Sequence, residues 1–254
     1  EIKYLFTDRG HIPTGPFSQG IKIGNFIYCS GVRPLDPKTQ KLVEGDFRRR
    51  VEQCFENLNA ILVQGGATLK DVYTTVVYLK NMDDRPIVNE VTRNYFKDGE
   101  FPLRVIVEIS RLNEDHDIEI ECAAYLGEKS YIFTTESLVP SGPFAQGVKI
   151  PPYIHCSGFL PVHPVTQKVD DDFKGRVRQC LENLRAVLRA GGGDLRQVYS
   201  TTVYLQDISK LPMVDEVFRE YFSNESFPVR QVIGIRRLYG DYDIEIACSA
   251  YLGD

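Results

Sequence analysis

Two arginines and two glutamates stand in matching contexts that suit the binding and hydrolysis of a small acid. "FPLRVIVEISRLNEDHDIEIECAAYLG" places Arg104 behind a proline and Glu119 fifteen residues later, and "FPVRQVIGIRRLYGDYDIEIACSAYLG" repeats this with Arg230 and Glu245. A planar guanidinium binds a carboxylate through two parallel hydrogen bonds, and a carboxylate side chain can take a proton from an attacking water. An Arg–Glu pair on a sheet surface would use the same residue types, so this pattern alone leaves both interpretations open.

A strand pattern fixes the direction of the two glutamates. In "DIEIECAAY" the isoleucines and the cysteine alternate with Glu119 and Glu121, so the apolar side chains point to one face and the acids to the other. The second copy keeps Glu245 but has Ala247 where Glu121 stands. Only Glu119 and Glu245 are therefore candidates for a role that both copies share.

These motifs belong to an internal duplication of nearly the whole chain. "GPFSQGIKIGNFIYCSGVRPLDPKTQKLVEGDF" from Gly15 matches "GPFAQGVKIPPYIHCSGFLPVHPVTQKVDDDF" from Gly142, and the register continues, after the loss of one residue near Gln167, to the end of the chain. A repeat this long is a domain rather than a solenoid unit. The sequence predicts a first domain over residues 1–128 and a second over residues 129–254.

Each repeat predicts an α+β fold. A hairpin is expected at Gly24–Asn25, where the second copy has Pro151–Pro152 instead. A long helix should begin after Asp46, a good N-cap, and end at Gly65–Gly66. "DVYTTVVYL" is rich in β-branched residues and predicts a strand, and Pro86 suits the first turn of a second helix. Strands separated by two helices indicate one mixed sheet with both helices packed on a single face.

Composition narrows the possible functions. The 254 residues are 43% hydrophobic and contain no run of eighteen apolar residues and no recognisable leader, so neither a membrane span nor a signal peptide is expected. The net charge of -5 disfavours binding to nucleic acid, which depends on clustered basic side chains. We expect no membrane and no nucleic-acid partner.

The cysteines and histidines do not predict a metal site. The six cysteines form three matched positions without C-x-x-C spacing, and buried, reduced thiols in a cytosolic protein are expected: Cys29 and Cys156, Cys54 and Cys180, Cys122 and Cys248. None of the four histidines is shared by the two copies. A histidine metal site or a histidine base common to both halves is therefore excluded, and the mechanism implied by the family resemblance described next requires no metal or cofactor.

Several segments together resemble a known family. "GPFSQG", "YCSG", "DPKTQ", "ENLNAIL", "TTVVYL", "FPLR" and "IEIECAAYL" are similar to the RidA (YjgF/YER057c/UK114) family, and their counterparts from "GPFAQG" to "IEIACSAYL" look like a second member fused behind the first. The resemblance implies a chorismate-mutase-like α+β fold and trimeric or pseudo-trimeric rings of domains with clefts between neighbours. It also implies hydrolysis of 2-imino acids, such as 2-iminobutanoate and 2-iminopropanoate, to 2-oxo acids and ammonia.

The resemblance also implies roles for individual residues. Arg104 and Arg230 match the arginine that binds the substrate carboxylate. Glu119 and Glu245 match the glutamate that positions the water. The other expected substrate contacts are the Ser-Gly turns, an aromatic wall and two backbone N–H groups: Ser30, Gly31, Ser157, Gly158, Phe17, Phe144, Ile106 and Val232.

Some positions depart from the family pattern. Phenylalanine replaces the tyrosine of the family's "GPY". Arg85 and Leu211 stand where the family often has a phenylalanine that lines the cleft. The two halves also differ from each other, because Ser18 corresponds to Ala145 and Asn89 to Asp215. Because Asp215 adds negative charge near a site for an acid, we expect the first repeat to be the more active. Two other functions stay open: an endoribonuclease or translation inhibitor, and a small-carboxylate-binding protein without turnover.

Overall fold

The chain forms two compact units, Glu1–Glu128 and Lys129–Asp254. The structure is a computed structural model that describes residues 1–96, 100–222 and 226–253. Within that part of the chain each unit contains one six-stranded mixed sheet and two α-helices. The predicted α+β fold is confirmed in both repeats.

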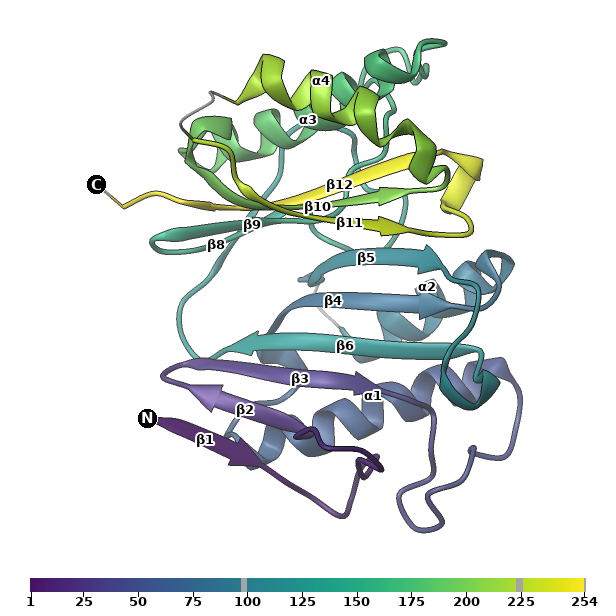
Figure 1. Cartoon of the computed structure of the whole chain (residues 1–254). Helices are drawn as coiled ribbons and strands as arrows, with labels where there is room; N and C mark the ends of the chain where they lie inside the picture. The colour runs from purple at the N-terminus through teal and green to yellow at the C-terminus, as the bar shows by residue number, and fades with distance from the viewer. Residues whose placement is uncertain (97–99, 223–225, 254) are drawn as a thin grey trace. The chain divides into compact units, whose positions relative to one another are not determined.

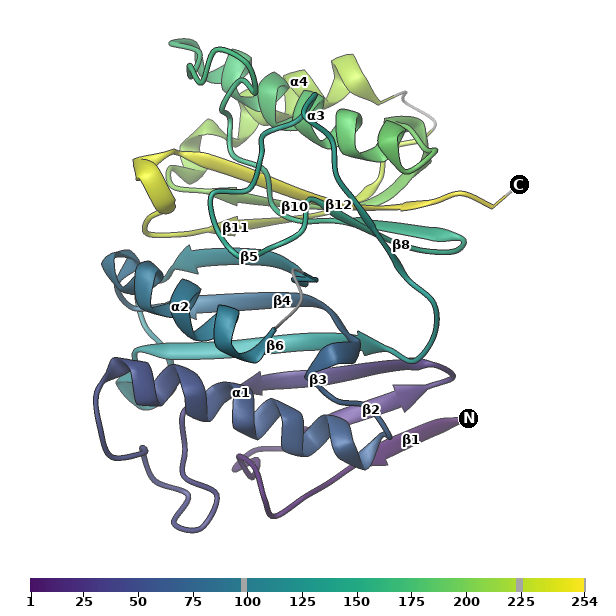
Figure 2. The ribbon, with the colours of Figure 1, turned by 180° about the vertical axis from the view of Figure 1, so that it is seen from behind.

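The first unit has the strand order β1-β2-β3-β6-β4-β5, in which β4 and β5 are parallel and the other neighbours are antiparallel. Both helices cover the same face of this sheet, which is the far face in Figure 1 and the near face in Figure 2. Its elements are β1 (Ile2–Leu5), β2 (Gly20–Ile23), β3 (Phe26–Val32), α1 (Phe47–Gln64), β4 (Val72–Leu79), α2 (Arg85–Tyr95), β5 (Leu103–Glu108) and β6 (Ile118–Tyr125).

The second unit repeats this topology with the order β11-β10-β12-β9-β8-β7, and β10 and β11 are its parallel pair. Its helices also lie together on one face of their sheet (Figure 1). Its elements are β7 (Ser130–Ile132), β8 (Gly147–Ile150), β9 (Tyr153–Cys156), α3 (Phe173–Ala190), β10 (Val198–Leu205), α4 (Leu211–Tyr221), β11 (Val229–Gly234) and β12 (Ile244–Tyr251).

Local signals in the sequence explain where these elements begin and end. The Asp46 carboxylate accepts a hydrogen bond of 3.0 Å from the Arg49 N–H, as expected of the N-cap of α1. Gly24 turns the β2–β3 hairpin with φ of 57°, a conformation that glycine adopts at little cost. Pro151–Pro152, joined by a cis peptide bond, turns the β8–β9 hairpin in its place.

The core of each unit lies between the sheet and its helices. In the first unit Leu58 of α1 packs with Ile118 and Ile120 of β6, and all three are fully buried. Each such side chain stabilises the fold by about 1.5–3 kcal/mol. All six cysteines are buried and free, which confirms the prediction of reduced thiols. Since Ile118 and Ile120 face the helices, Glu119 between them must point to the open face of the sheet.

None of the helices in the described residues is both long enough and apolar enough to span a membrane.

Candidate functional site

Arg104 points toward the helices of the first unit. On β5, Ile106 packs into the helix-side core and the Glu108 carboxylate accepts a hydrogen bond of 2.7 Å from the Met82 N–H. Side chains alternate between the two faces along a strand, and Arg104 is two residues from Ile106, so its side chain points to the same face. Its Nη1 donates a hydrogen bond of 2.8 Å to Oδ1 of Asn89 on α2.

Glu119 leaves the opposite face of the same sheet. It stands across from Tyr78 of β4, and β4 separates β6 from β5. The second unit repeats the arrangement, because Glu245 alternates with core residues of β12 whereas Arg230 reaches α4. An Arg–Glu pair within one unit, the structural alternative to a site, is therefore ruled out. Within one unit the two groups therefore do not meet.

The two Ser-Gly pairs lie directly against the two glutamates, and Ser30 and Gly31 belong to strand β3 rather than to the expected turn. A Cβ atom placed on Gly31 would overlap Oε1 of Glu119, and one on Gly158 would overlap Oε1 of Glu245. Any larger residue would force the carboxylate to move. The glycines of the sequence motif are thus required by the position of the glutamate side chain, in both units alike.

The serines of these pairs hold a neighbouring segment in place. Ser30 Oγ donates a hydrogen bond of 2.6 Å to the carbonyl of Ser18, and Ser157 Oγ donates one of 2.6 Å to the carbonyl of Ala145. Because the backbone of residue 18 or 145 is the acceptor, the change from serine to alanine preserves this contact. The aromatic residue of the motif, Phe17 in the first copy, directly precedes the acceptor and is 48% exposed.

Burial raises the pKa values of acidic side chains on the face of the first sheet that the helices do not cover. Burial raises the pKa of Glu119 above its usual range, while the charges of Arg33 and His116 oppose this. Burial and the neighbouring Glu119 raise the pKa of Glu121. Burial together with these two carboxylates raises the pKa of Tyr78 to about 12. A carboxylate with a raised pKa is a better proton acceptor when it is ionised, which suits a general base.

A buried charge cluster beside Glu119 was missed by the sequence reasoning. Arg33 is 3% exposed, its Nη1 lies 3.1 Å from Oε2 of Glu114, and its Nη2 lies 3.2 Å from Nε2 of His11. His116 contacts the same Glu114 carboxylate at 3.2 Å. The second copy has Leu160 in place of Arg33. Because the candidate residues were those that both copies share, Arg33 was not among them. An arginine inside the apolar "CSGVRP" segment was the available signal.

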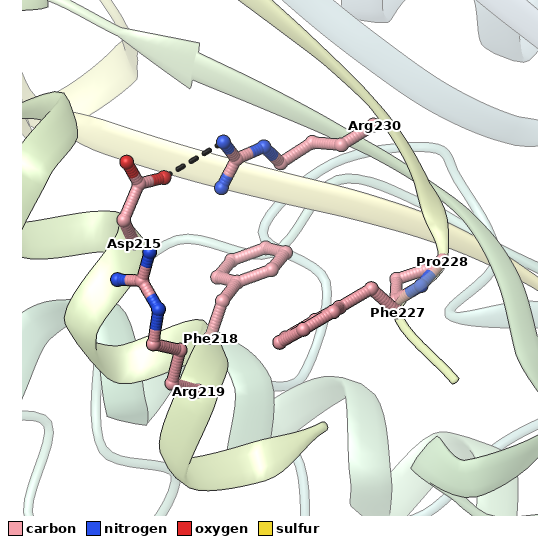
Figure 3. A pocket seen from close by; sticks show the side chains of 6 residues that line it. All are labelled: Asp215, Phe218, Arg219, Phe227, Pro228 and Arg230. Atoms are coloured by element: carbon pink, nitrogen blue, oxygen red, sulfur yellow. Dashed lines mark ion pairs between the residues drawn. The ribbon is translucent and has the colours of Figure 1, made fainter. Parts of the chain in front are cut away.

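The arginine of the second unit lies in a pocket of about 400 Å³, shown in Figure 3. Arg230 Nη2 forms an ion pair of 2.7 Å with Oδ1 of Asp215. The guanidinium also lies over the ring of Phe218, 5.1 Å from its centroid. The pocket is lined by Asp215, Phe218, Arg219, Phe227, Pro228 and Arg230.

The remaining predicted positions contribute mainly to packing. Ile106 lies within the first core, and Val232 packs against the second, so only their backbone groups are left to contact a ligand. Arg85 is buried at the start of α2, and Leu211, its counterpart, packs against the second core. No group of three or more metal-ligating side chains is present among the described residues.

Comparisons with known proteins match each repeat separately. The family model described as Endoribonuclease L-PSP matches residues 9–126 and again residues 134–252. A RutC family protein of Pyrococcus abyssi is 46% identical over 121 residues, which cover 48% of this chain and 94% of that protein. A protein of Dermatophagoides farinae named 2-iminobutanoate/2-iminopropanoate deaminase is 33% identical over 109 residues, which cover 43% of this chain and 84% of that protein.

A solved structure is also similar to about half of this chain. A putative endoribonuclease of Thermotoga maritima is 39% identical, with a TM-score of 0.48, and the match covers 50% of this chain and 98% of that one. The two matches of the family model, and relatives whose matches cover about half of the chain, show a tandem duplication of a RidA-type domain.

Proposed function

The chain belongs to the endoribonuclease L-PSP family of RidA-type proteins, and from this premise we propose that it hydrolyses 2-imino acids to 2-oxo acids and ammonia. The relative from Dermatophagoides farinae, which is named as such a deaminase, supports the choice of reaction. The substrate class is a small carboxylate with a carbon–nitrogen double bond at C2.

One observation carries this proposal. In both units a glutamate on the open face of the sheet lies so close to a glycine that a Cβ atom there would displace its carboxylate, Glu119 against Gly31 and Glu245 against Gly158. A surface ion pair does not require such an arrangement. A base that must leave room for a water and a small substrate does. The raised pKa of Glu119, caused mainly by burial, is in keeping with that role.

The reaction divides between the two shared side chains. The arginine binds the carboxylate of the imino acid through paired hydrogen bonds and so fixes the position of C2. The glutamate accepts a proton from water as the water oxygen forms a bond to C2, and the electron pair of the C=N bond moves to nitrogen. That nitrogen takes up the proton held by the glutamate, the new hydroxyl group gives up its own proton to the leaving nitrogen as the C–N bond breaks, and ammonia leaves as the C=O bond of the 2-oxo acid forms.

This division of labour requires two domains, and the ring of three domains that the resemblance implies requires more than one chain. Since the arginine and the glutamate of one unit leave opposite faces of its sheet, the complete site combines an arginine from one domain with a glutamate from another. Rings of three domains, built from two-domain chains, would provide such pairs. Light scattering should give a mass above the 28.9 kDa of one chain. A species of 28.9 kDa that still hydrolyses imines would contradict the ring.

A coupled assay tests the activity. A threonine dehydratase supplies 2-iminobutanoate, and the initial rate of ammonia release is measured with and without this protein. We expect a rate above that of spontaneous hydrolysis, and expect the double variant Glu119→Gln with Glu245→Gln not to provide it. RNA is incubated with the same preparation. RNA cleavage without accelerated ammonia release would favour the endoribonuclease alternative, and binding of 2-oxo acids without either activity would favour a carboxylate-binding protein.

A further inference from the structure

The carboxylate beside Arg230 distinguishes the second arginine pocket from its counterpart in the first unit. Arg230 forms an ion pair with Asp215, whereas Arg104 donates a hydrogen bond to the neutral amide of Asn89. We infer that the pocket around Arg230 binds an α-amino acid with an apolar side chain, and that Asp215 selects its ammonium group. This inference rests on the proposed function in one respect, because it takes Arg230 as a carboxylate anchor.

The carboxylate of Asp215 directly beside the anchor argues against a simple acid as the ligand. Asp215 already neutralises the guanidinium of Arg230 across 2.7 Å. A 2-oxo acid would therefore bring a second carboxylate next to the first, and like charges at such short range disfavour each other. An α-amino acid carries an ammonium group on the carbon next to its carboxylate. Its carboxylate can pair with Arg230 while its ammonium pairs with Asp215, so both charges of the ligand have a partner.

The geometry leaves donors for such a ligand. A guanidinium carries five N–H donors, and the pair with Asp215 is made by Nη2 of Arg230. Figure 3 shows the two charged groups at one side of the pocket, with Asp215 and Arg219 projecting from the same helix, α4. Arg219 lines the pocket as a second cation and supports the binding of a carboxylate there.

Aromatic residues form the other walls of the pocket. Phe218 stacks beneath the guanidinium of Arg230, a cation–π contact that holds the anchor in place. Phe227 and Pro228 complete an apolar surface (Figure 3). In the first unit Thr92 occupies the position of Phe218, and its hydroxyl donates to the backbone carbonyl of Val88. Phe101 and Pro102 match Phe227 and Pro228, so the aromatic residue that distinguishes the second pocket is Phe218.

A pair of ligands with the same carbon skeleton tests the selection. L-2-Aminobutanoate and 2-oxobutanoate differ only at C2, and calorimetry measures the Kd of each. The variant Arg104→Ala removes the first anchor, so that binding reports on Arg230. We expect L-2-aminobutanoate to bind this variant about tenfold more tightly than 2-oxobutanoate, which corresponds to about 1.4 kcal/mol. Adding Asp215→Asn, a nearly isosteric change, should reverse the order.

The first unit provides the matched control. In Arg230→Ala, binding reports on Arg104 and its neutral neighbour Asn89, and 2-oxobutanoate should be the tighter ligand. Adding Asn89→Asp should shift the preference toward L-2-aminobutanoate. Circular dichroism and the Tm of each variant establish that the fold is retained.

Three results would overturn the inference. These are an unchanged order of affinities after Asp215→Asn, tighter binding of 2-oxobutanoate to Arg104→Ala, and no binding of either ligand to folded Arg104→Ala. Each of them is compatible with imine hydrolysis at the Arg104 anchor. Conversely, amino-acid binding that depends on Asp215, found together with no imine hydrolysis, would refute the proposed function and leave this inference standing.

Discussion

The two repeats keep the same anchor and the same base but surround them with different charges. In the first, Arg104 is bonded to a neutral amide, and Glu119 has Glu121 beside it and is influenced by the buried cation Arg33. In the second, Arg230 is paired with Asp215, while Ala247 and Leu160 replace Glu121 and Arg33. The backbone arrangement is common to both units. The two halves therefore differ in the charges around the site and not in the backbone that positions it.

The largest effect is expected from removing both anchors. Arg104→Ala combined with Arg230→Ala should abolish binding of 2-oxo acids, because no other shared side chain at that strand offers two donors to a carboxylate. The single variants sharpen the comparison. Arg104→Ala should cost more imine hydrolysis than Arg230→Ala, since Asp215 already occupies the second arginine. A greater loss from Arg230→Ala in a folded protein would reverse the order of the two repeats.

Removing the bases separates catalysis from binding. Glu119→Gln with Glu245→Gln retains shape and hydrogen bonding but removes the proton acceptor. Hydrolysis should slow by about a hundredfold or more, the low end of what a general base contributes, while 2-oxo acids still bind. Rates from the coupled assay and a Kd for 2-oxobutanoate measure the two effects. If the rate stayed at the wild-type level while binding was lost only with the arginines, the protein would be a carboxylate sensor.

The glycines test whether the two units use the same geometry. Gly31→Ala places a Cβ against Oε1 of Glu119, and Gly158→Ala does the same to Glu245. Because the atoms that clash belong to the end of a flexible side chain, the carboxylate should rotate away and the fold should survive. We expect about a ten- to hundredfold loss of the activity that depends on each glutamate. Unchanged rates in both variants would show that the carboxylate position is not critical.

Much of the scaffold could be predicted from sequence because its signals are local. Asp46 caps α1 through its own side chain, and Gly24 turns a hairpin through its own backbone. The direction of Glu119 could also be predicted, since only one face of "DIEIECAAY" is apolar. These features depend on residues that are neighbours in the chain.

The direction of Arg104 could not be predicted in the same way. The strand "LRVIVE" has apolar residues at both parities, so alternation does not say which face meets the helices. The bond to Asn89 and the ion pair between Arg230 and Asp215 depend on how a helix packs on an edge strand. Only the structure therefore shows that Arg104 and Glu119 point to opposite faces of the sheet.

The smallest expected effect concerns Arg33, which occurs in the first repeat alone. Burial raises the pKa of Glu119, and the charge of Arg33 counteracts this. Arg33→Leu, which introduces the residue of the second repeat, should therefore raise the pKa of Glu119 further. Since only the ionised glutamate can accept a proton, the acid limb of the pH–rate profile should move to higher pH, with a several-fold loss of rate below it and little change above it.

This shift is measured in a Glu245→Gln background, so that the rate reports on Glu119 alone. Arg33→Lys serves as the control, because it keeps a cation at the same position and should restore the original profile. A loss of rate that is the same at every pH would instead mean that Arg33 supports the structure of the turn. A rate that falls above the pKa of Glu119, instead of below it, would show that Glu119 acts in its protonated form, as an acid rather than a base. Either result would remove Arg33 from the electrostatic differences that distinguish the first repeat from the second.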